Sequence, residues 1–157
     1  MSGGLSAGII LFRRSGACPE VLLVRPGGPY WRRKDIGAWQ IPKGAVEPGE
    51  EPLDAAFREA EEELGLRPVG EPLPLGRIRQ TGGKLVEAYA VEAPFEPAKL
   101  KSILFEMEWP PRSGRFQHFP EVEEARWFTL AEARERMLPS QQPLLERLEQ
   151  VLDGQDW

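Results

Sequence analysis

The stretch GAVEPGEEPLDAAFREAEEELGL, residues 44–66, holds eight acidic residues and a single basic one, Arg58. Pro52 suits the first position of a helix and Gly65 suits the position just after its last turn, so we predict a helix over residues 52–64. Apolar residues recur in it with the helical period and would form a narrow stripe that packs on a core. That stripe consists of Leu53, Ala56, Phe57, Ala60 and Leu64.

The acidic residues of this helix stand where they oppose its stability. Glu59, Glu62 and Glu63 fall on one flank of the apolar stripe, within an arc of roughly 100°. They lie near the negative end of the helix dipole and have no lysine four residues further on. A divalent cation would offset both effects, because Mg²⁺ prefers carboxylate oxygens and keeps waters for substrate phosphates. The alternatives are a solvated acidic face without a function and a metal-free interaction helix.

The spacing of the fixed residues resembles the Nudix box, which reads G-x₅-E-x₇-R-E-apolar-x-E-E-x-G-apolar. Seven positions match, and Leu66 fills the last apolar place, whereas Ala60 is smaller than the usual aliphatic residue. The matching positions are Gly44, Glu50, Arg58, Glu59, Glu62, Glu63 and Gly65. The resemblance implies an α/β/α sandwich with a mixed sheet, in which the box forms loop, helix and loop. It also implies hydrolysis of a nucleoside diphosphate linked to another moiety, with Mg²⁺ or Mn²⁺ as the cofactor.

The same resemblance assigns roles within the box. Glu59, Glu62 and Glu63 would be metal ligands, and Gly44 would add its backbone carbonyl. Arg58 would orient glutamates through charge-assisted hydrogen bonds, Glu50 among them. These six residues form the predicted catalytic and metal-binding set of the helix and its preceding loop.

The reaction also needs a general base near the attacking water. Glu121 in FPEVEEARWF is similar in placement to the additional glutamate of several Nudix enzymes, so we predict it as the base. A surface role for Glu121 is the alternative, and four other glutamates compete with it. These are Glu106, Glu108, Glu123 and Glu124. His118, the only histidine, is expected to be a loop residue.

Substrate contacts are predicted in the Gly- and Pro-rich segment before the box. Its cations, Lys43 and the cluster Arg32, Arg33 and Lys34, would bind outer phosphates, although the cluster could also be a solvated turn. Tyr30 and Trp31 would stack on a base, while Trp39 is expected in the core. Arg112 and Arg115 either close over the substrate or are solvated.

One run indicates a substrate class. WQIPKGAVEPGE, residues 39–50, resembles the corresponding run of Nudix enzymes that cleave dinucleoside polyphosphates. We therefore expect a substrate such as diadenosine tetraphosphate. A nucleoside triphosphate pyrophosphohydrolase and a non-catalytic nucleotide-binding Nudix module are the alternatives.

Composition limits the class of protein. The chain of 157 residues suits one domain, expected over residues 1–157, and 41% of its residues are hydrophobic. Its apolar runs are too short to span a bilayer. A secretory signal would carry a basic residue before its apolar stretch, and none precedes the first apolar run of this sequence. The single cysteine excludes an internal disulfide framework. We therefore expect a cytoplasmic protein that does not bind a membrane.

Charge is segregated along the chain, whose net charge is −5. Residues 1–43 carry +5 and residues 44–66 carry −7. A nucleic-acid-binding protein would show a broad basic face without an acidic block, so we expect that this chain does not bind nucleic acid. Metal ions beside a polyphosphate would use both signs of charge. The expected partner is a small-molecule nucleotide, and the chain would be a monomer or a homodimer.

The remaining pattern predicts an α/β layered domain with a mixed sheet. Expected strands cover residues 5–14, 21–25 and 125–129, and a hairpin over residues 73–93 turns near Gly82 and Gly83. Residues 94–120 are expected to be irregular. Thr129 and Glu132 form a capping-box pattern that starts a helix, and a final helix is expected over residues 142–152.

Overall fold

A computed structural model describes residues 4–16, 18–80 and 82–154 of the chain. Its central strand is β1 (Leu5–Ser15), and alternate residues of this strand serve two different cores. Ile9 and Leu11 point to one face of the sheet, whereas Ile10 and Phe12 point to the other. The two-residue period of a strand therefore divides one apolar run between both faces.

The strands around β1 form a mixed sheet, as predicted. The order is β4-β5-β1-β2-β8, and the first part of β1 also pairs with β3. β1 and β5 are parallel, whereas the other pairs are antiparallel. The bounds are β2 (Cys18–Pro26), β3 (Lys43–Ala45), β4 (Leu73–Arg79), β5 (Leu85–Glu92) and β8 (Val122–Thr129).

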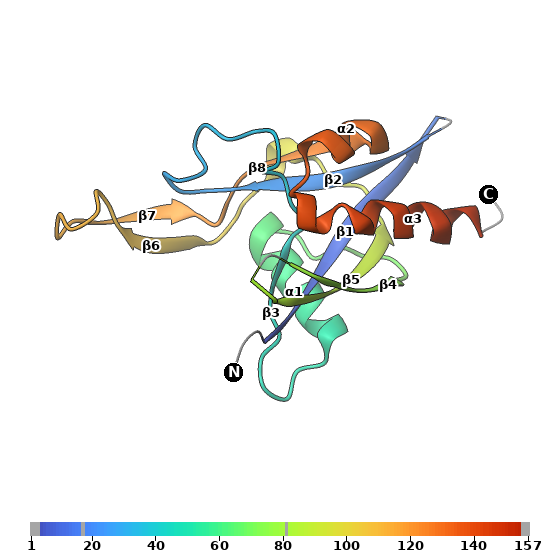
Figure 1. Ribbon diagram of the computed structural model, residues 1–157, viewed down its shortest axis with the longest axis horizontal. Coiled ribbons are helices and arrows are strands. Elements are labelled where there is room, and N and C mark those ends of the chain that lie inside the picture. The colour runs from blue at the N-terminus through green and yellow to red at the C-terminus, as the bar shows by residue number, and fades with distance from the viewer. Residues whose placement is uncertain (1–3, 17, 81, 155–157) are drawn as a thin grey trace.

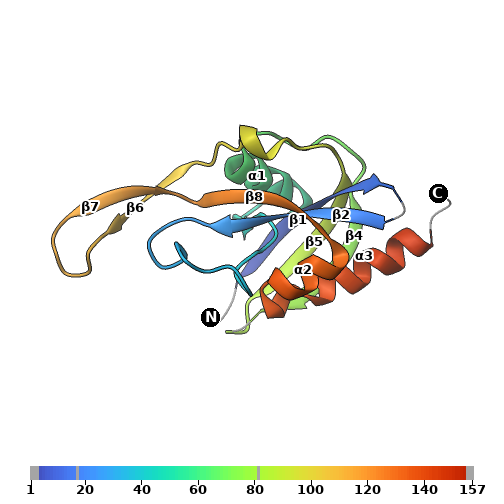
Figure 2. The same ribbon diagram turned by 90° about the horizontal axis from the view of Figure 1, so that it is seen from above.

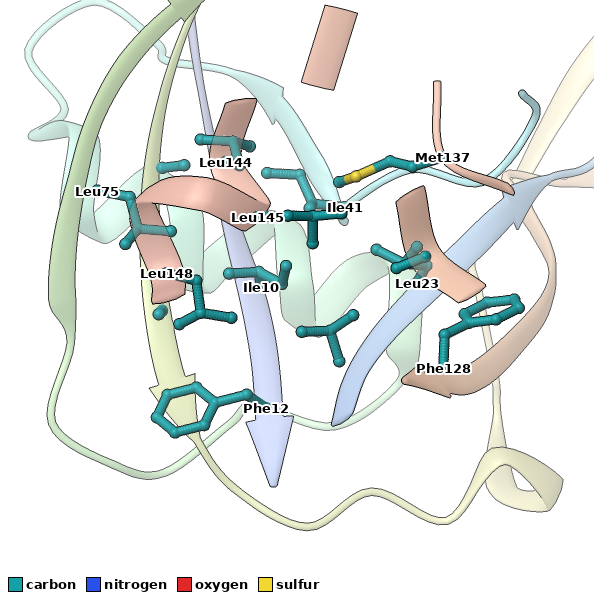
Figure 3. Close-up of a cluster of buried hydrophobic side chains, with 14 of the residues drawn as sticks. Ile10, Phe12, Leu23, Ile41, Leu75, Phe128, Met137, Leu144, Leu145 and Leu148 are labelled. Carbon is teal, nitrogen blue, oxygen red and sulfur yellow. The ribbon is translucent and has the colours of Figure 1, made fainter. Parts of the chain in front are cut away.

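Helices cover both faces of this sheet (Figure 2). α1 (Pro52–Leu64) packs on one face, where its small residues Ala56 and Ala60 lie against the side chains of β1 and β2. α2 (Leu130–Arg136) and α3 (Pro143–Asp153) cover the other face. There, Leu144, Leu145 and Leu148 of α3 meet Ile10 and Phe12 of β1 (Figure 3). Two short 3₁₀ helices, η1 (Pro97–Lys99) and η2 (Pro139–Gln141), join these elements.

The helix predicted over residues 52–64 is confirmed. Pro52 opens α1, and Gly65 ends it in the left-handed region with φ of 84° while its N–H donates to the carbonyl of Glu61. The capping box at Thr129 and Glu132 is also confirmed at the start of α2. The hairpin that turns at Gly82 and Gly83 joins β4 to β5. Ala17, between β1 and β2, and Thr81, between β4 and β5, lie outside the described residues.

The prediction of an irregular segment over residues 94–120 is wrong in its second half. β6 (Leu104–Glu108) and β7 (Phe116–Pro120) pair as a separate two-stranded hairpin that projects from the body of the molecule (Figure 1). The Pro-Pro pair at residues 110–111 lies in the tip of the hairpin rather than in a strand. Proline excluded this segment from a central strand, but it does not prevent a strand outside the main sheet.

Two other points concern the elements. The segment between β2 and α1 contains the three-residue strand β3, which pairs with Ser6, Ala7 and Gly8 of β1. The pairing places the start of the acidic stretch on the main sheet. Within the part of the chain that the structure describes, no helix is long and apolar enough to cross a membrane.

Candidate active site

Arg58 of α1 is the hub of the acidic cluster. Its Nε and Nη2 donate to both oxygens of Glu50 at 2.8 and 2.9 Å, and its Nη1 donates to Glu59 at 2.9 Å. Longer contacts of 3.4 to 3.5 Å reach Glu62, and Nη2 also donates to the carbonyl of Ala45 at 3.0 Å. The bonds from Arg58 and from the backbone N–H of Glu47 lower the pKa of Glu50 to about 2. One guanidinium thus ties the preceding loop to two glutamates of the helix.

Gly44 lies on β3, directly against the carboxylate of Glu59. A Cβ at position 44 would overlap that carboxylate, so no larger residue fits without moving it. The short distance also leaves the backbone of Gly44 beside Glu59. The predicted combination of a glycine carbonyl with a box glutamate is therefore geometrically compatible with this strand.

Glu63 is the most deeply buried carboxylate of the cluster, with 8% of its surface exposed. Its carboxylate accepts a hydrogen bond of 3.1 Å from the backbone N–H of Lys43. Burial, followed by the negative charge of Glu59, raises the pKa of Glu63 to about 8. Burial also lowers the pKa of the Lys43 ammonium, and Lys84 acts in the same direction. A buried carboxylate and a half-buried lysine therefore lie at the same place.

Glu121 joins this cluster from a segment far away in the chain, between β7 and β8. Its negative charge contributes to the raised pKa of both Glu59 and Glu63, and Glu62 in turn helps burial to raise the pKa of Glu121. Backbone hydrogen bonds through Ile103 connect the two segments, since its N–H donates to the carbonyl of Glu62 at 3.1 Å and its carbonyl accepts from the N–H of Glu121 at 2.9 Å. The structure thus brings the predicted base beside the predicted metal ligands.

The donor set fits a hard divalent cation. The predicted ligands Glu59, Glu62 and Glu63 and the backbone carbonyl of Gly44 would supply the oxygen atoms that Mg²⁺ or Mn²⁺ prefers. In the described residues no three acidic, histidine or cysteine side chains are arranged closely enough to hold a metal ion as they stand. Arg58 draws Glu59 and Glu62 toward itself, and Lys43 holds Glu63 by its backbone. The predicted ligand set therefore stays a prediction.

A cavity of about 410 Å³ opens beside the carboxylates. Its polar lining comes from Lys43, Glu63 and Glu121, and its apolar lining includes Trp31 and Phe105. Its volume lies within the usual range for small-molecule sites, roughly 300–1,000 Å³. Charged groups and aromatic rings thus share one cavity of a size suited to a nucleotide.

The predicted substrate residues divide between this cavity and the surface around it. Lys43 and Trp31 line the cavity. Arg32 lines a different cavity of about 260 Å³ together with Arg25 and Gly28. Tyr30 is 59% exposed and packs edge-on against Trp109, while the ammonium of Lys34 lies 5.4 Å from the centre of the Trp31 ring.

The other candidates from the sequence lie outside the cavity. Trp39 is buried, as expected, and its indole N–H donates to Asp35 at 2.7 Å. His118 and Glu106 face each other at 3.5 Å on the exposed hairpin. Arg112 and Arg115 are exposed near the hairpin tip. None of these five candidates lines the cavity beside Glu63.

Sequence reasoning missed two residues near the site. Phe105 lines the cavity from the hairpin, and no local signal marked a residue in a segment expected to be irregular. Lys84 follows the turn between β4 and β5, and its charge lowers the pKa of Lys43. The sequence placed a turn near Gly82 and Gly83, but it gave no sign that Lys84 acts on Lys43, because that depends on how the strands pair.

Known proteins resemble this chain in sequence. A family model described as the NUDIX domain matches residues 4–148. An RNA pyrophosphohydrolase from Francisella tularensis subsp. mediasiatica is 47% identical over 49 residues, which cover 31% of this chain and 32% of that protein. The match therefore spans about a third of the curated relative.

Solved structures share the fold over nearly the whole chain. An Ap4A hydrolase from C. elegans, in a binary complex, has a TM-score of 0.67 and 20% identity, and the alignment covers 96% of this chain and 99% of the other. The NUDIX domain of Shewanella oneidensis NrtR, complexed with ADP ribose, has a TM-score of 0.66 and 18% identity, with 97% and 90% covered. At these identities the likeness concerns the fold alone.

Proposed function

The chain belongs to the NUDIX family, and we propose that it hydrolyses a phosphoanhydride bond in a nucleoside diphosphate linked to another moiety. The observation that carries this proposal is that Glu63 of α1, Glu121 and Lys43 line one cavity. Carboxylates suit the metal, and the lysine suits the phosphate of such a substrate. The activity is that of a pyrophosphohydrolase.

Each group of the site has a definable task in this reaction. A bound Mg²⁺ or Mn²⁺ would neutralise phosphate oxygens and lower the pKa of the attacking water. Lys43, which lines the cavity, would bind a phosphate oxygen. Arg58 holds the side chains of Glu50, Glu59 and Glu62 in position through its hydrogen bonds.

We assign the general base to Glu121. It lines the cavity, and burial raises the pKa of its carboxyl, which makes it a stronger base than an exposed glutamate. Glu63 shares both properties, but its carboxylate already accepts a hydrogen bond from the backbone of Lys43. Glu63 is therefore better suited to holding a cation than to moving a proton.

Within this activity we propose a dinucleoside polyphosphate such as diadenosine tetraphosphate as the substrate. Support comes from the WQIPKGAVEPGE run, which ends in the hydrogen-bonded loop at Glu50. The C. elegans neighbour is an Ap4A hydrolase, which is consistent with this choice. The 47% identity to an RNA pyrophosphohydrolase favours a second candidate, the triphosphate end of an RNA. A nucleoside triphosphate is the third.

Product chromatography tests these substrates directly. The protein is incubated with Mg²⁺ and diadenosine tetraphosphate, nucleoside triphosphates, ADP-ribose, NADH or a 5′-triphosphorylated RNA. ATP formed from diadenosine tetraphosphate is the expected result. Pyrophosphate released from the RNA or from a triphosphate alone would move the assignment to that substrate.

Two variants of the same helix serve as controls. Glu62→Gln should lower kcat by at least about 100-fold, because it removes a charged ligand, while the fold stays intact. Glu61→Gln changes an exposed carboxylate, whose partner is Arg67 at 3.8 Å, and should leave kcat unchanged. No turnover of any compound with Mg²⁺ or Mn²⁺ would overturn the hydrolase and favour a nucleotide-binding module.

A further inference from the structure

The cavity beside the carboxylates has two aromatic walls that come from different segments. Trp31 belongs to the loop after β2, and Phe105 belongs to β6 of the projecting hairpin. Both rings line the same cavity as Lys43, Glu63 and Glu121. The site therefore has one charged side suited to phosphates and two flat apolar groups that the hydrolysis of phosphates does not itself require.

The base of the hairpin is fixed to the catalytic helix by backbone hydrogen bonds. The N–H of Ile103 donates to the carbonyl of Glu62 at 3.1 Å, and the N–H of Glu121 donates to the carbonyl of Ile103 at 2.9 Å. The N–H of Gly27 then donates to the carbonyl of Glu121 at 3.0 Å. Phe105 stands two residues after Ile103, so its position is set relative to the carboxylates.

The ring of Phe105 is supported on two sides. It lies directly across the hairpin from Phe119, with ring centres 6.0 Å apart. On the loop side a Cβ at Gly28 would stand 3.2 Å from the ring, and Gly28 has a positive φ of 98°. The absence of a side chain at Gly28 therefore lets the loop approach the ring closely.

The loop and the hairpin also touch at their outer ends. Tyr30 packs edge-on against Trp109 with ring centres 5.5 Å apart. The two segments thus meet near the carboxylates, through Gly27 and Glu121, and again at the tip. The hairpin can be followed in Figure 1, where it projects beside the loop after β2. This arrangement makes a wall whose inner side includes Phe105.

We propose that Phe105 is a specificity-determining residue that stacks on the nucleobase of the substrate, with Trp31 as the second aromatic wall. The proposal rests on the proposed function, because the phosphates must lie at Lys43 and the carboxylates. Every nucleobase has a flat face, and stacking on an aromatic side chain is a general way of binding it. A cavity of about 410 Å³ accommodates one nucleoside with its phosphate.

Binding of AMP tests the stacking apart from turnover, since AMP contains no phosphoanhydride bond. Calorimetry with Mg²⁺ compares AMP with ribose 5-phosphate, which lacks the base, for the wild type and for Phe105→Ala. Loss of the ring should weaken AMP binding by about 5- to 100-fold and leave ribose 5-phosphate unchanged. Phe105→Trp should retain AMP binding, and Phe105→Leu provides the same test with the apolar volume kept.

The matched control is Phe116→Ala, which removes an exposed ring on the opposite face of the same hairpin and should not change either affinity. Equal weakening of AMP and ribose 5-phosphate in the Phe105 variants would overturn the proposal, as would a wild type that does not distinguish the two ligands. Absence of hydrolysis with AMP binding still dependent on Phe105 would overturn the proposed function alone. Hydrolysis with an unchanged kcat/KM in Phe105→Leu would overturn the stacking alone.

Discussion

At the scale of single residues, the acidic cluster depends on one arginine. Arg58 is the cation that contacts Glu50, Glu59 and Glu62, so its loss leaves their repulsion uncompensated. Arg58→Ala should lower the free energy of unfolding by about 1–2 kcal/mol in metal-free buffer. Because a divalent cation would replace the missing positive charge, the loss should shrink as Mg²⁺ is added.

Urea denaturation with EDTA and with Mg²⁺ measures this effect. Arg67→Ala is the matched control, since Arg67 is half exposed and contacts only Glu61, at 3.8 Å, among the salt bridges of the described residues. Its effect should stay within about 0.5 kcal/mol in both buffers. A loss in Arg58→Ala that does not depend on Mg²⁺ would contradict the view that metal and arginine balance the same charges.

Glu63 illustrates the cost of a buried carboxylate. Its pKa rises from the ordinary 4.5 to about 8 on folding, chiefly because of burial. Between these values the folded protein holds a proton that the unfolded chain has released, so this group makes the protein less stable as the pH rises from 4.5 to 8. Glu63→Gln removes the titration and should stabilise the metal-free protein at pH 8 by about 1–3 kcal/mol, and much less at pH 5.

Thermal unfolding in EDTA across this pH range follows the prediction. Glu61→Gln, an exposed change on the same helix, is the matched control for removing one charge from α1. A gain for Glu63→Gln that is equal at pH 5 and pH 8 would mean that the carboxyl does not titrate in this window. Glu63→Gln should therefore raise the stability of the metal-free protein and weaken its binding of a metal ion.

At the scale of elements, α2 depends on its capping box. The helix has seven residues, the hydroxyl of Thr129 accepts from the N–H of Glu132, and the Glu132 carboxylate accepts from the N–H of Thr129. Thr129→Ala removes one of these bonds and should cost about 1 kcal/mol. Chemical denaturation measures the loss, and Thr129→Ser, which keeps the hydroxyl, should retain most of the stability. An equal loss in both variants would show that the methyl group, rather than the cap, matters.

The elements also show where sequence reasoning succeeds. α1 could be predicted to its ends, because Pro52 and Gly65 act locally and the apolar stripe fixes the buried face. β3 could not, because a strand of three residues has no period to detect and exists through its pairing with β1. The hairpin of β6 and β7 was missed for a similar reason, since its strands pair only with each other in the described chain.

The candidate site divides in the same way. Glu59, Glu62 and Glu63 share one helix, so their common flank follows from helical geometry. The burial of Glu63 and its bond to the backbone of Lys43 depend on how β3 packs against α1. The place of Phe105 in the cavity depends on a hairpin that begins at Leu104, 40 residues after α1 ends at Leu64. Such contacts arise only from the packing of distant segments.

At the scale of the whole molecule, the segregated charges of the sequence meet at one edge of the sheet. Lys43 ends the basic part of the chain and Glu63 belongs to the acidic part. The backbone N–H of Lys43 donates a hydrogen bond to the carboxylate of Glu63. The two cores lie on either side of β1 and hold this edge in place. The hairpin of β6 and β7 lies outside the main sheet, and its strands pair only with each other in the described chain. A two-stranded hairpin is less stable by itself than a strand inside a larger sheet.

Hydrogen exchange should separate these two parts. β1 lies between β5 and β2 in the main sheet, with a core on each face, whereas β6 pairs only with β7 in the described chain. Amides of residues 104–108 should therefore exchange at least about 100-fold faster than those of residues 9–12, because local opening of the hairpin costs less than global unfolding. AMP with Mg²⁺ should slow exchange in the hairpin and in residues 27–34, and leave α3 unchanged. Mass spectrometry of peptic fragments measures both comparisons. If the hairpin is as protected as β1 without ligand, it unfolds together with the sheet as one cooperative unit.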